Sequence, residues 1–268
     1  MKNHVISRAL CVFGASAALT SFAHAGITGI YKTNYTGTSA TQLTLYTSLA
    51  NVASNTGGVN SNLTTSMSDA RYMYVFGDFT QAQNTQGYMY KTLYNGSGRV
   101  SQIVRYVANS LNPIENLRTD TGGQVFNLTG FGGSGGWDRE DDFFHDGSAF
   151  YRNRTVSGGS NGVTKYATFS DLVSNTNGTT YNYGITYGYN DRFFGFEGKI
   201  YRTNTGGPGG SVNGIAVYNS FNDLLNRNVA QTINSSNWSA GDMFIAVPTP
   251  GAMALVGLAG LVSRRRKD

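Results

Sequence analysis

The sequence has 268 residues, a formal net charge of +5 and one cysteine, Cys11. A single cysteine excludes an internal disulfide and a zinc site built from thiolates. Of the 20 Lys and Arg residues, two lie in residues 1–25 and four in residues 248–268, where Asp268 is the only acidic residue of either segment. The other 14 basic and 14 acidic residues cancel, so the body carries no net charge that would predict a nucleic-acid partner.

The first 25 residues have the pattern of a secretory signal peptide. Lys2 and Arg8 precede an apolar stretch, and Ala23 and Ala25 flank His24 in an A-x-A cleavage site. The pattern predicts export, with a mature chain that starts at Gly26.

The body, residues 26–247, is rich in Gly, Ser, Thr, Asn and Tyr. Short aromatic and β-branched runs separated by Asn/Gly turns predict an all-β domain. A unit with two tyrosine anchors recurs four times, and this is the strongest signal in the chain. The first anchor precedes Lys or Arg, and the second follows 15 to 17 residues later, before a predicted helical turn. The pairs are Tyr31 and Tyr46, Tyr90 and Tyr106, Tyr151 and Tyr166, and Tyr201 and Tyr218.

Aromatic strands are predicted before the second, third and fourth units, at 71–77, 141–147 and 191–198, and the copy missing from the first unit is found at 241–247. With one more strand after each helical turn, every unit has four strands. The pattern predicts a four-bladed β-propeller whose closing blade combines 26–34 and 42–48 with 230–236 and 241–247. A β-sandwich with internal repeats is the alternative. The unit weakly resembles a hemopexin-type blade, with an aromatic pair, Gly, Tyr-Arg, a strand and a helical turn, which implies similar architecture only.

The repeated Tyr-Lys/Arg pairs are expected to be structural. Alternation along a strand would place the tyrosine between blades and turn the neighbouring cation towards water or a carboxylate.

Candidate ligand-binding residues gather where the third unit departs from the others, in a Gly-rich loop and the acidic strand after it. They are Trp137, Asp138, Glu140, Asp141, Asp142 and Asp146, with His145 among them. Clustered carboxylates suit Ca²⁺ and an exposed Trp suits stacking on a sugar, so carbohydrate binding with or without Ca²⁺ is one interpretation. A hydrolase that uses residues 138–146 is the alternative function, and a solvated hairpin with a purely structural role is the third interpretation.

The last segment, residues 248–268, has an apolar run from Ala252 to Val262 between a Pro/Gly turn and a basic cluster. Eleven residues are short for a membrane span, which needs about 20. The segment resembles the PEP-CTERM sorting signal of Gram-negative bacteria, with Thr249 where the motif has Glu. The motif positions are Pro248, Pro250, Gly251, Arg264, Arg265 and Arg266.

This resemblance implies brief insertion into the inner membrane, cleavage by an exosortase-type enzyme, and release to the cell surface or extracellular matrix. A retained short membrane anchor is the alternative. Together the observations predict an exported, non-catalytic binding or structural protein, for which extracellular polysaccharide is the first partner to test.

Overall fold

The structure is a computed structural model that describes residues 27–36, 39–67, 75–78, 87–95, 99–108, 114–129, 141–156, 159–188, 191–196, 199–205, 212–238 and 244–248. These residues form four antiparallel sheets of four strands. In order, the first sheet contains β16 (Phe244–Pro248), β1 (Ile27–Thr36), β2 (Ser39–Tyr46) and β3 (Val59–Met67). The second contains β4 (Val75–Asp78), β5 (Gly87–Tyr94), β6 (Val100–Ala108) and β7 (Gln124–Asn127).

The third sheet contains β8 (Asp142–His145), β9 (Phe150–Val156), β10 (Gly159–Tyr166) and β11 (Thr179–Tyr187). The fourth contains β12 (Phe193–Phe196), β13 (Lys199–Thr205), β14 (Val212–Tyr218) and β15 (Gln231–Trp238). One short helix joins the third and fourth strands of each sheet: α1 (Leu49–Ser54), α2 (Glu115–Thr119), α3 (Phe169–Ser174) and α4 (Phe221–Asn226). The all-β class and the four-strand unit with a helical turn are therefore confirmed.

The two ends of the described chain meet in the first sheet, as predicted. Strand β1 pairs with β16, and this ladder runs from Ile27 opposite Pro248 to Lys32 opposite Phe244. Two details of the prediction are wrong. The strand includes Pro248, and residues 231–236 of the predicted strand 230–236 lie in β15 of the fourth sheet, whereas β3 completes the first. The side chains of Val59, Asn60, Asn62 and Thr64 are exposed, so β3 lacks the apolar alternation that marks a strand in sequence.

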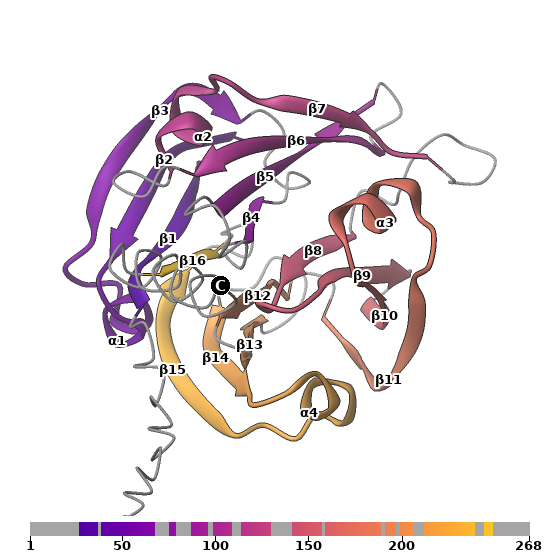
Figure 1. The fold of residues 1–268 in the computed structure, drawn as a ribbon. Helices are drawn as coiled ribbons and strands as arrows, with labels where there is room; N and C mark the ends of the chain where they lie inside the picture. The colour runs from indigo at the N-terminus through magenta and orange to yellow at the C-terminus, as the bar shows by residue number, and fades with distance from the viewer. Residues whose placement is uncertain are drawn as a thin grey trace, which may run out of the picture.

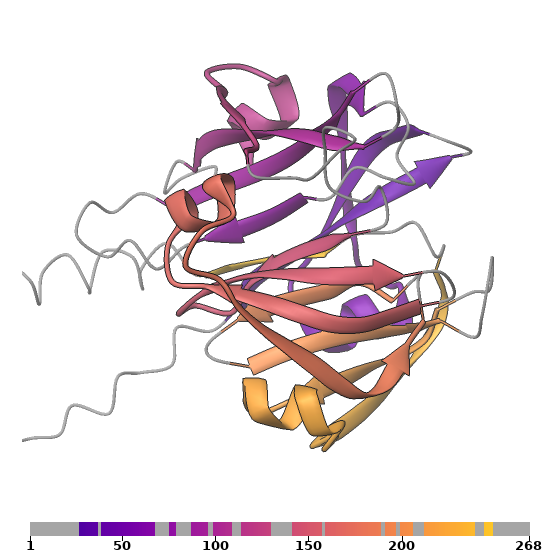
Figure 2. The ribbon, with the colours of Figure 1, turned by 90° about the vertical axis from the view of Figure 1, so that its right-hand side faces the viewer.

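The four sheets follow one another in a cycle (Figure 1). Strands β4, β8, β12 and β16 lie in the middle of the molecule, and each contacts two of the other three. The helices lie at the periphery, and Figure 2 shows α2 and α4 at opposite edges. Helices α1, α2 and α4 contact β15, β3 and β11, which are the last strands of the preceding sheets. The Val173 carbonyl of α3 accepts a hydrogen bond from Thr129 N–H, just after β7, at 3.1 Å.

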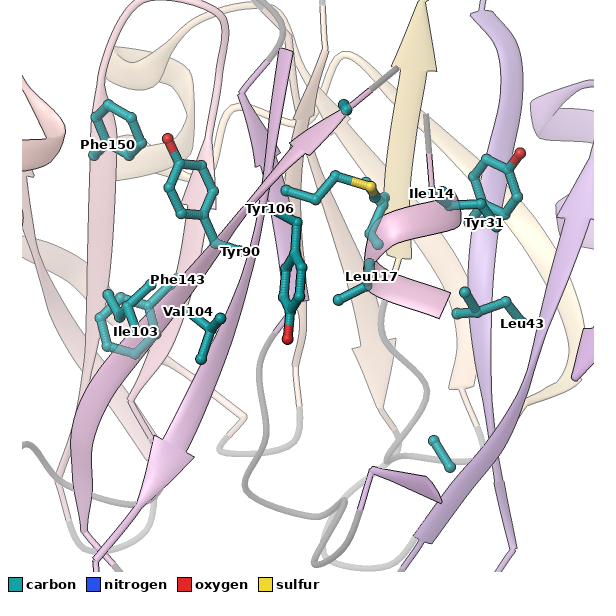
Figure 3. Packing of buried hydrophobic residues seen from close by; sticks show 14 of the residues in the cluster. Tyr31, Leu43, Tyr90, Ile103, Val104, Tyr106, Ile114, Leu117, Phe143 and Phe150 are labelled. Carbon is teal, nitrogen blue, oxygen red and sulfur yellow. The ribbon is translucent and has the colours of Figure 1, made fainter. Parts of the chain in front are cut away.

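The buried core lies between neighbouring sheets. One cluster joins the first three sheets, a second joins the first and fourth, and a third joins the third and fourth. Figure 3 shows part of the first cluster, in which Tyr90 and Phe150 lie side by side and Leu117 of α2 lies near Tyr106. The rings of Tyr90 and Phe150 meet edge to face at 5.9 Å, a favourable geometry for an aromatic pair.

The repeated tyrosines belong to this core, and all eight are at most 8% exposed. The cation that follows the first anchor pairs with a carboxylate in three repeats: Lys91 with Asp120 at 2.7 Å, Arg152 with Asp141 at 2.6 Å, and Arg202 with Asp191. The structural interpretation of the Tyr-Lys/Arg pairs is thus confirmed for these three repeats.

The second tyrosine anchors the end of each helix in three repeats. Its hydroxyl donates to the side chain of the left-handed residue that ends the helix, Asn55 for Tyr46, Asp120 for Tyr106 and Asn175 for Tyr166. In the fourth repeat Arg227 ends the helix instead, and the Tyr218 hydroxyl accepts from Arg202 Nε at 3.2 Å. The Asn or Asp residue at the helix end therefore has two roles. Its backbone adopts the left-handed conformation that ends the helix, and its side chain accepts a hydrogen bond from the tyrosine hydroxyl.

Candidate functional site

Half of the predicted ligand-binding segment lies in the described part of the chain. Asp141 immediately precedes β8, Asp142 and His145 lie at its two ends, and Asp146 follows it. Trp137, Asp138 and Glu140 lie outside the described residues. The described carboxylates are 1% to 5% exposed, so the third interpretation is wrong about their solvation, although their contacts agree with the structural role that it gave them.

Asp141 is held within its own sheet. Its Oδ2 accepts a hydrogen bond from Arg152 Nε at 2.6 Å, and Arg152 lies on the neighbouring strand β9. The fourth sheet repeats this arrangement, because Asp191 just before β12 pairs with Arg202 on β13. A pair that occurs in two units at matching positions serves the sheet, so Asp141 is a structural residue.

Asp142 links two sheets. Its Oδ1 accepts from the backbone N–H of Phe143 at 2.9 Å, and its Oδ2 accepts from the backbone N–H of Phe193 at 2.8 Å. Phe193 begins β12, so the carboxylate joins the central strands β8 and β12. Burial raises the pKa of Asp142 to about 7, although the nearby positive charge of Arg192 and the two hydrogen bonds favour the ionised form. Asp141 and Asp142 thus have separate partners, as strand alternation predicts.

Asp146 organises the turn between β8 and β9. Its Oδ1 accepts from the backbone N–H groups of Ser148 at 2.8 Å and Ala149 at 3.0 Å, and its Oδ2 accepts from the Tyr151 hydroxyl at 2.7 Å. Burial opposes ionisation, but the bonds from Tyr151 and Ser148 hold the pKa of Asp146 below its usual value. His145 Nδ1 accepts from Gly147 N–H at 3.1 Å, which adds a second side-chain bond to the turn.

The three carboxylates therefore do three different structural tasks. Among the residues that the structure describes, no group of three or more His, Cys, Asp or Glu side chains could hold a metal ion. Binding of Ca²⁺ or carbohydrate by this segment stays a prediction that depends on Trp137, Asp138 and Glu140. The hydrolase interpretation gains no free carboxylate from Asp141 or Asp142.

The structure reveals a second candidate site that the sequence reasoning missed. Arg105 on β6 lies over three aromatic rings, those of Tyr88, Phe126 and Phe169, where the second sheet meets α3 of the third. Lys165 on β10 lies over Tyr151 and Phe221 where the third sheet meets α4. The available signal was the residue before the second tyrosine anchor, which is cationic in these two repeats alone.

The predicted processing residues lie at or beyond the ends of the described chain. Pro248 is the last residue of β16. Ala23, Ala25, Pro250, Gly251, Arg264, Arg265 and Arg266 lie outside the described residues. No described helix is long and apolar enough to span a bilayer. No family model matches the chain, and no curated protein matches it in sequence.

Proposed function

We propose that this chain is an exported surface or matrix protein that binds extracellular polysaccharide through a non-catalytic, four-bladed β-propeller. A PEP-CTERM-like tail would direct it through the inner membrane, and an exosortase-type enzyme would remove that tail. The observation that carries the proposal is the ladder between β1 and β16, in which Ile27 lies opposite Pro248. Ile27 is the second residue of the predicted mature chain, and Pro248 is the first residue of the predicted sorting motif.

Cleavage at both predicted points would leave a closed body. A mature chain from Gly26 that ends after Pro248 keeps every residue pair of the β1–β16 ladder. A cut before Pro248 would remove the partner of Ile27. This pairing supports a cut on the C-terminal side of Pro248, which would leave residues 249–268 as the tail.

The propeller architecture is supported by the cyclic order of contacts. Central strands β4, β8, β12 and β16 each contact two of the other three, and α1 contacts β15, which joins the first unit to the last. The buried clusters lie between neighbouring sheets. In a β-sandwich the core would lie between the inner faces of two sheets packed on each other.

The mass of the exported protein tests this proposal. We expect a chain that starts at Gly26, ends just after Pro248 and is found outside the inner membrane. A full-length C-terminus on protein retained in the inner membrane would favour the short anchor. Replacement of Arg264, Arg265 and Arg266 by Gln should block processing, whereas the same change at Lys199, on the exposed surface of β13, should leave it unchanged.

A further inference from the structure

Two junctions between neighbouring sheets carry a cation on an aromatic surface. The Arg105 guanidinium carbon lies 4.7 Å from the ring centre of Tyr88 and 4.8 Å from that of Phe126. The Lys165 ammonium lies 5.4 Å from the ring centre of Phe221 and 5.8 Å from that of Tyr151. All of these distances are within the range of cation–π attraction.

The two junctions are built from the same positions of the repeat. Arg105 and Lys165 each precede the second tyrosine anchor and lie opposite the first anchor of their sheet, Tyr90 and Tyr151. On the last strand of each sheet, Gln124 lies opposite Arg105 and Thr179 lies opposite Lys165. Phe126 and Tyr181 come two residues after these partners, at equivalent positions. The helix of the following sheet begins with Phe169 in one case and Phe221 in the other.

The fold does not need a cation at this position. The equivalent residues of the other two sheets are Leu45 and Val217, and both pack in hydrophobic clusters, Leu45 against the first and Val217 in the second. The second and third repeats therefore differ from the first and fourth in having a cation over aromatic rings at this position, and the fold does not require it. Repeats that depart from the shared pattern without a structural need are candidates for binding.

Both cations have capacity left for a ligand. Arg105 Nη2 donates to Gln124 Oε1 at 2.6 Å, which uses one of the five N–H donors of a guanidinium. No described carboxylate forms an ion pair with Arg105 or Lys165. Lys91, Arg152 and Arg202, in contrast, each hold a carboxylate.

The aromatic surface around Arg105 is accessible. Tyr88, Arg105, Phe126 and Phe169 are all half-buried, and Gln124 is exposed. Val107, which pairs with Tyr88 across the strands, is 38% exposed. A partly exposed ring offers a flat apolar face to the C–H groups of a sugar, and a neighbouring guanidinium binds a carboxylate by paired hydrogen bonds.

We infer that the Arg105 and Lys165 junctions are two binding sites for a polysaccharide that carries carboxylate groups. Each site stacks a sugar ring on its half-buried aromatic residues, Tyr88, Phe126 and Phe169 at the first site and Tyr181 and Phe221 at the second, and pairs the cation with a uronate carboxylate. The body has no net charge, so the two cations act locally and select an acidic sugar instead of attracting any polyanion. Two equivalent sites on adjacent sheets suit a repeating chain, because one polymer that occupies both gains affinity over either site alone. This inference rests on the proposed function and names its ligand class.

The test measures binding of the purified full chain to polygalacturonate, with neutral dextran as comparison. Replacing both Arg105 and Lys165 by Gln should weaken polygalacturonate binding at least tenfold, because both charges are lost while the first two methylenes of each side chain are kept. The exchanged variant, Arg105→Lys with Lys165→Arg, keeps both charges and should bind within threefold of the parent. Lys199→Gln removes one exposed charge elsewhere and should bind within twofold.

The outcomes separate this inference from the proposed function. Parent protein that binds neither polymer contradicts the proposed function itself, and with it this inference. Parent protein that binds polygalacturonate as tightly as the double Gln variant contradicts the two sites alone. If the double variant does not fold, the NMR signal of the Arg105 side-chain Nε–H in the parent decides, since polygalacturonate should shift it and dextran should not.

Discussion

Asp142→Asn should remove most of a pH dependence that this buried carboxylate gives to folding. In the folded protein, burial raises the pKa of Asp142 from its usual 3.8 to about 7. Each tenfold change in proton affinity corresponds to about 1.4 kcal/mol. Ionised Asp142 therefore costs the folded state roughly 4 kcal/mol relative to the unfolded chain.

The sign of the effect follows from the same values. Between about pH 4 and pH 7 the folded protein binds the proton of Asp142 more tightly than the unfolded chain, so the free energy of unfolding falls as the pH rises. Above pH 7 the contribution is constant. The bonds that hold the pKa of Asp146 below its usual value act in the opposite sense and are lost in a more acidic range, below about pH 4.

Urea unfolding at intervals from pH 4.5 to pH 8.5 measures this dependence. The parent should lose roughly 3 kcal/mol of stability over the range, and Asp142→Asn should give a much flatter curve. Asp223→Asn is the matched control, because it removes one carboxylate in the first turn of α4 and should keep the slope of the parent. A parent whose stability is constant or rises from pH 5 to pH 7 would refute the reasoning.

Three further predictions concern packing and the chain ends. Gly123→Ala should destabilise the folded protein by about 1–3 kcal/mol in thermal unfolding, because a Cβ there would lie 2.8 Å from Tyr106 Cε1. Gly122→Ala is the control: its Cβ would meet open space, so only the left-handed backbone, worth about 1 kcal/mol, should oppose it. Asp146→Ala should cost about 3–5 kcal/mol in urea unfolding, since two backbone N–H groups and two hydroxyls lose a charged acceptor; an unchanged midpoint would contradict this. A chain that ends after Pro248 should unfold at the temperature of the full chain, whereas one that ends before Phe244 lacks β16 and should lose cooperative unfolding.

The overall design of the fold could be predicted from sequence because it repeats. Four copies of a pair of tyrosines gave the number of sheets, and the displaced aromatic strand gave the pairing of β1 with β16. The position of β3 could not be predicted in the same way, because its outward side chains are polar and its apolar signal is weak. The prediction that residues 230–236 belong to the closing sheet is wrong for this reason.

The roles of the acidic residues could not be read from their spacing. The partner of Asp141 is Arg152, and that of Asp142 is the N–H of Phe193, 51 positions away in another sheet. Nothing local distinguishes such buried carboxylates from exposed ones, since burial depends on which strands meet at the centre. The matching pair of Asp191 and Arg202 offered a hint, because a carboxylate shared by two repeats at one position indicates a structural role.

Departures from the repeat remain the best guide to binding, but they must also be accessible. The acidic segment is the most conspicuous difference among the four repeats in sequence. Its described carboxylates, however, already accept hydrogen bonds from β9, from β12 and from the turn between β8 and β9. Arg105 is a single substitution relative to the equivalent residues Leu45 and Val217. Its side chain and the aromatic rings beneath it are only half-buried. A single cation on a partly exposed junction thus offers a ligand more free hydrogen-bond donors than the buried acidic residues offer free acceptors, because the fold already uses those carboxylates.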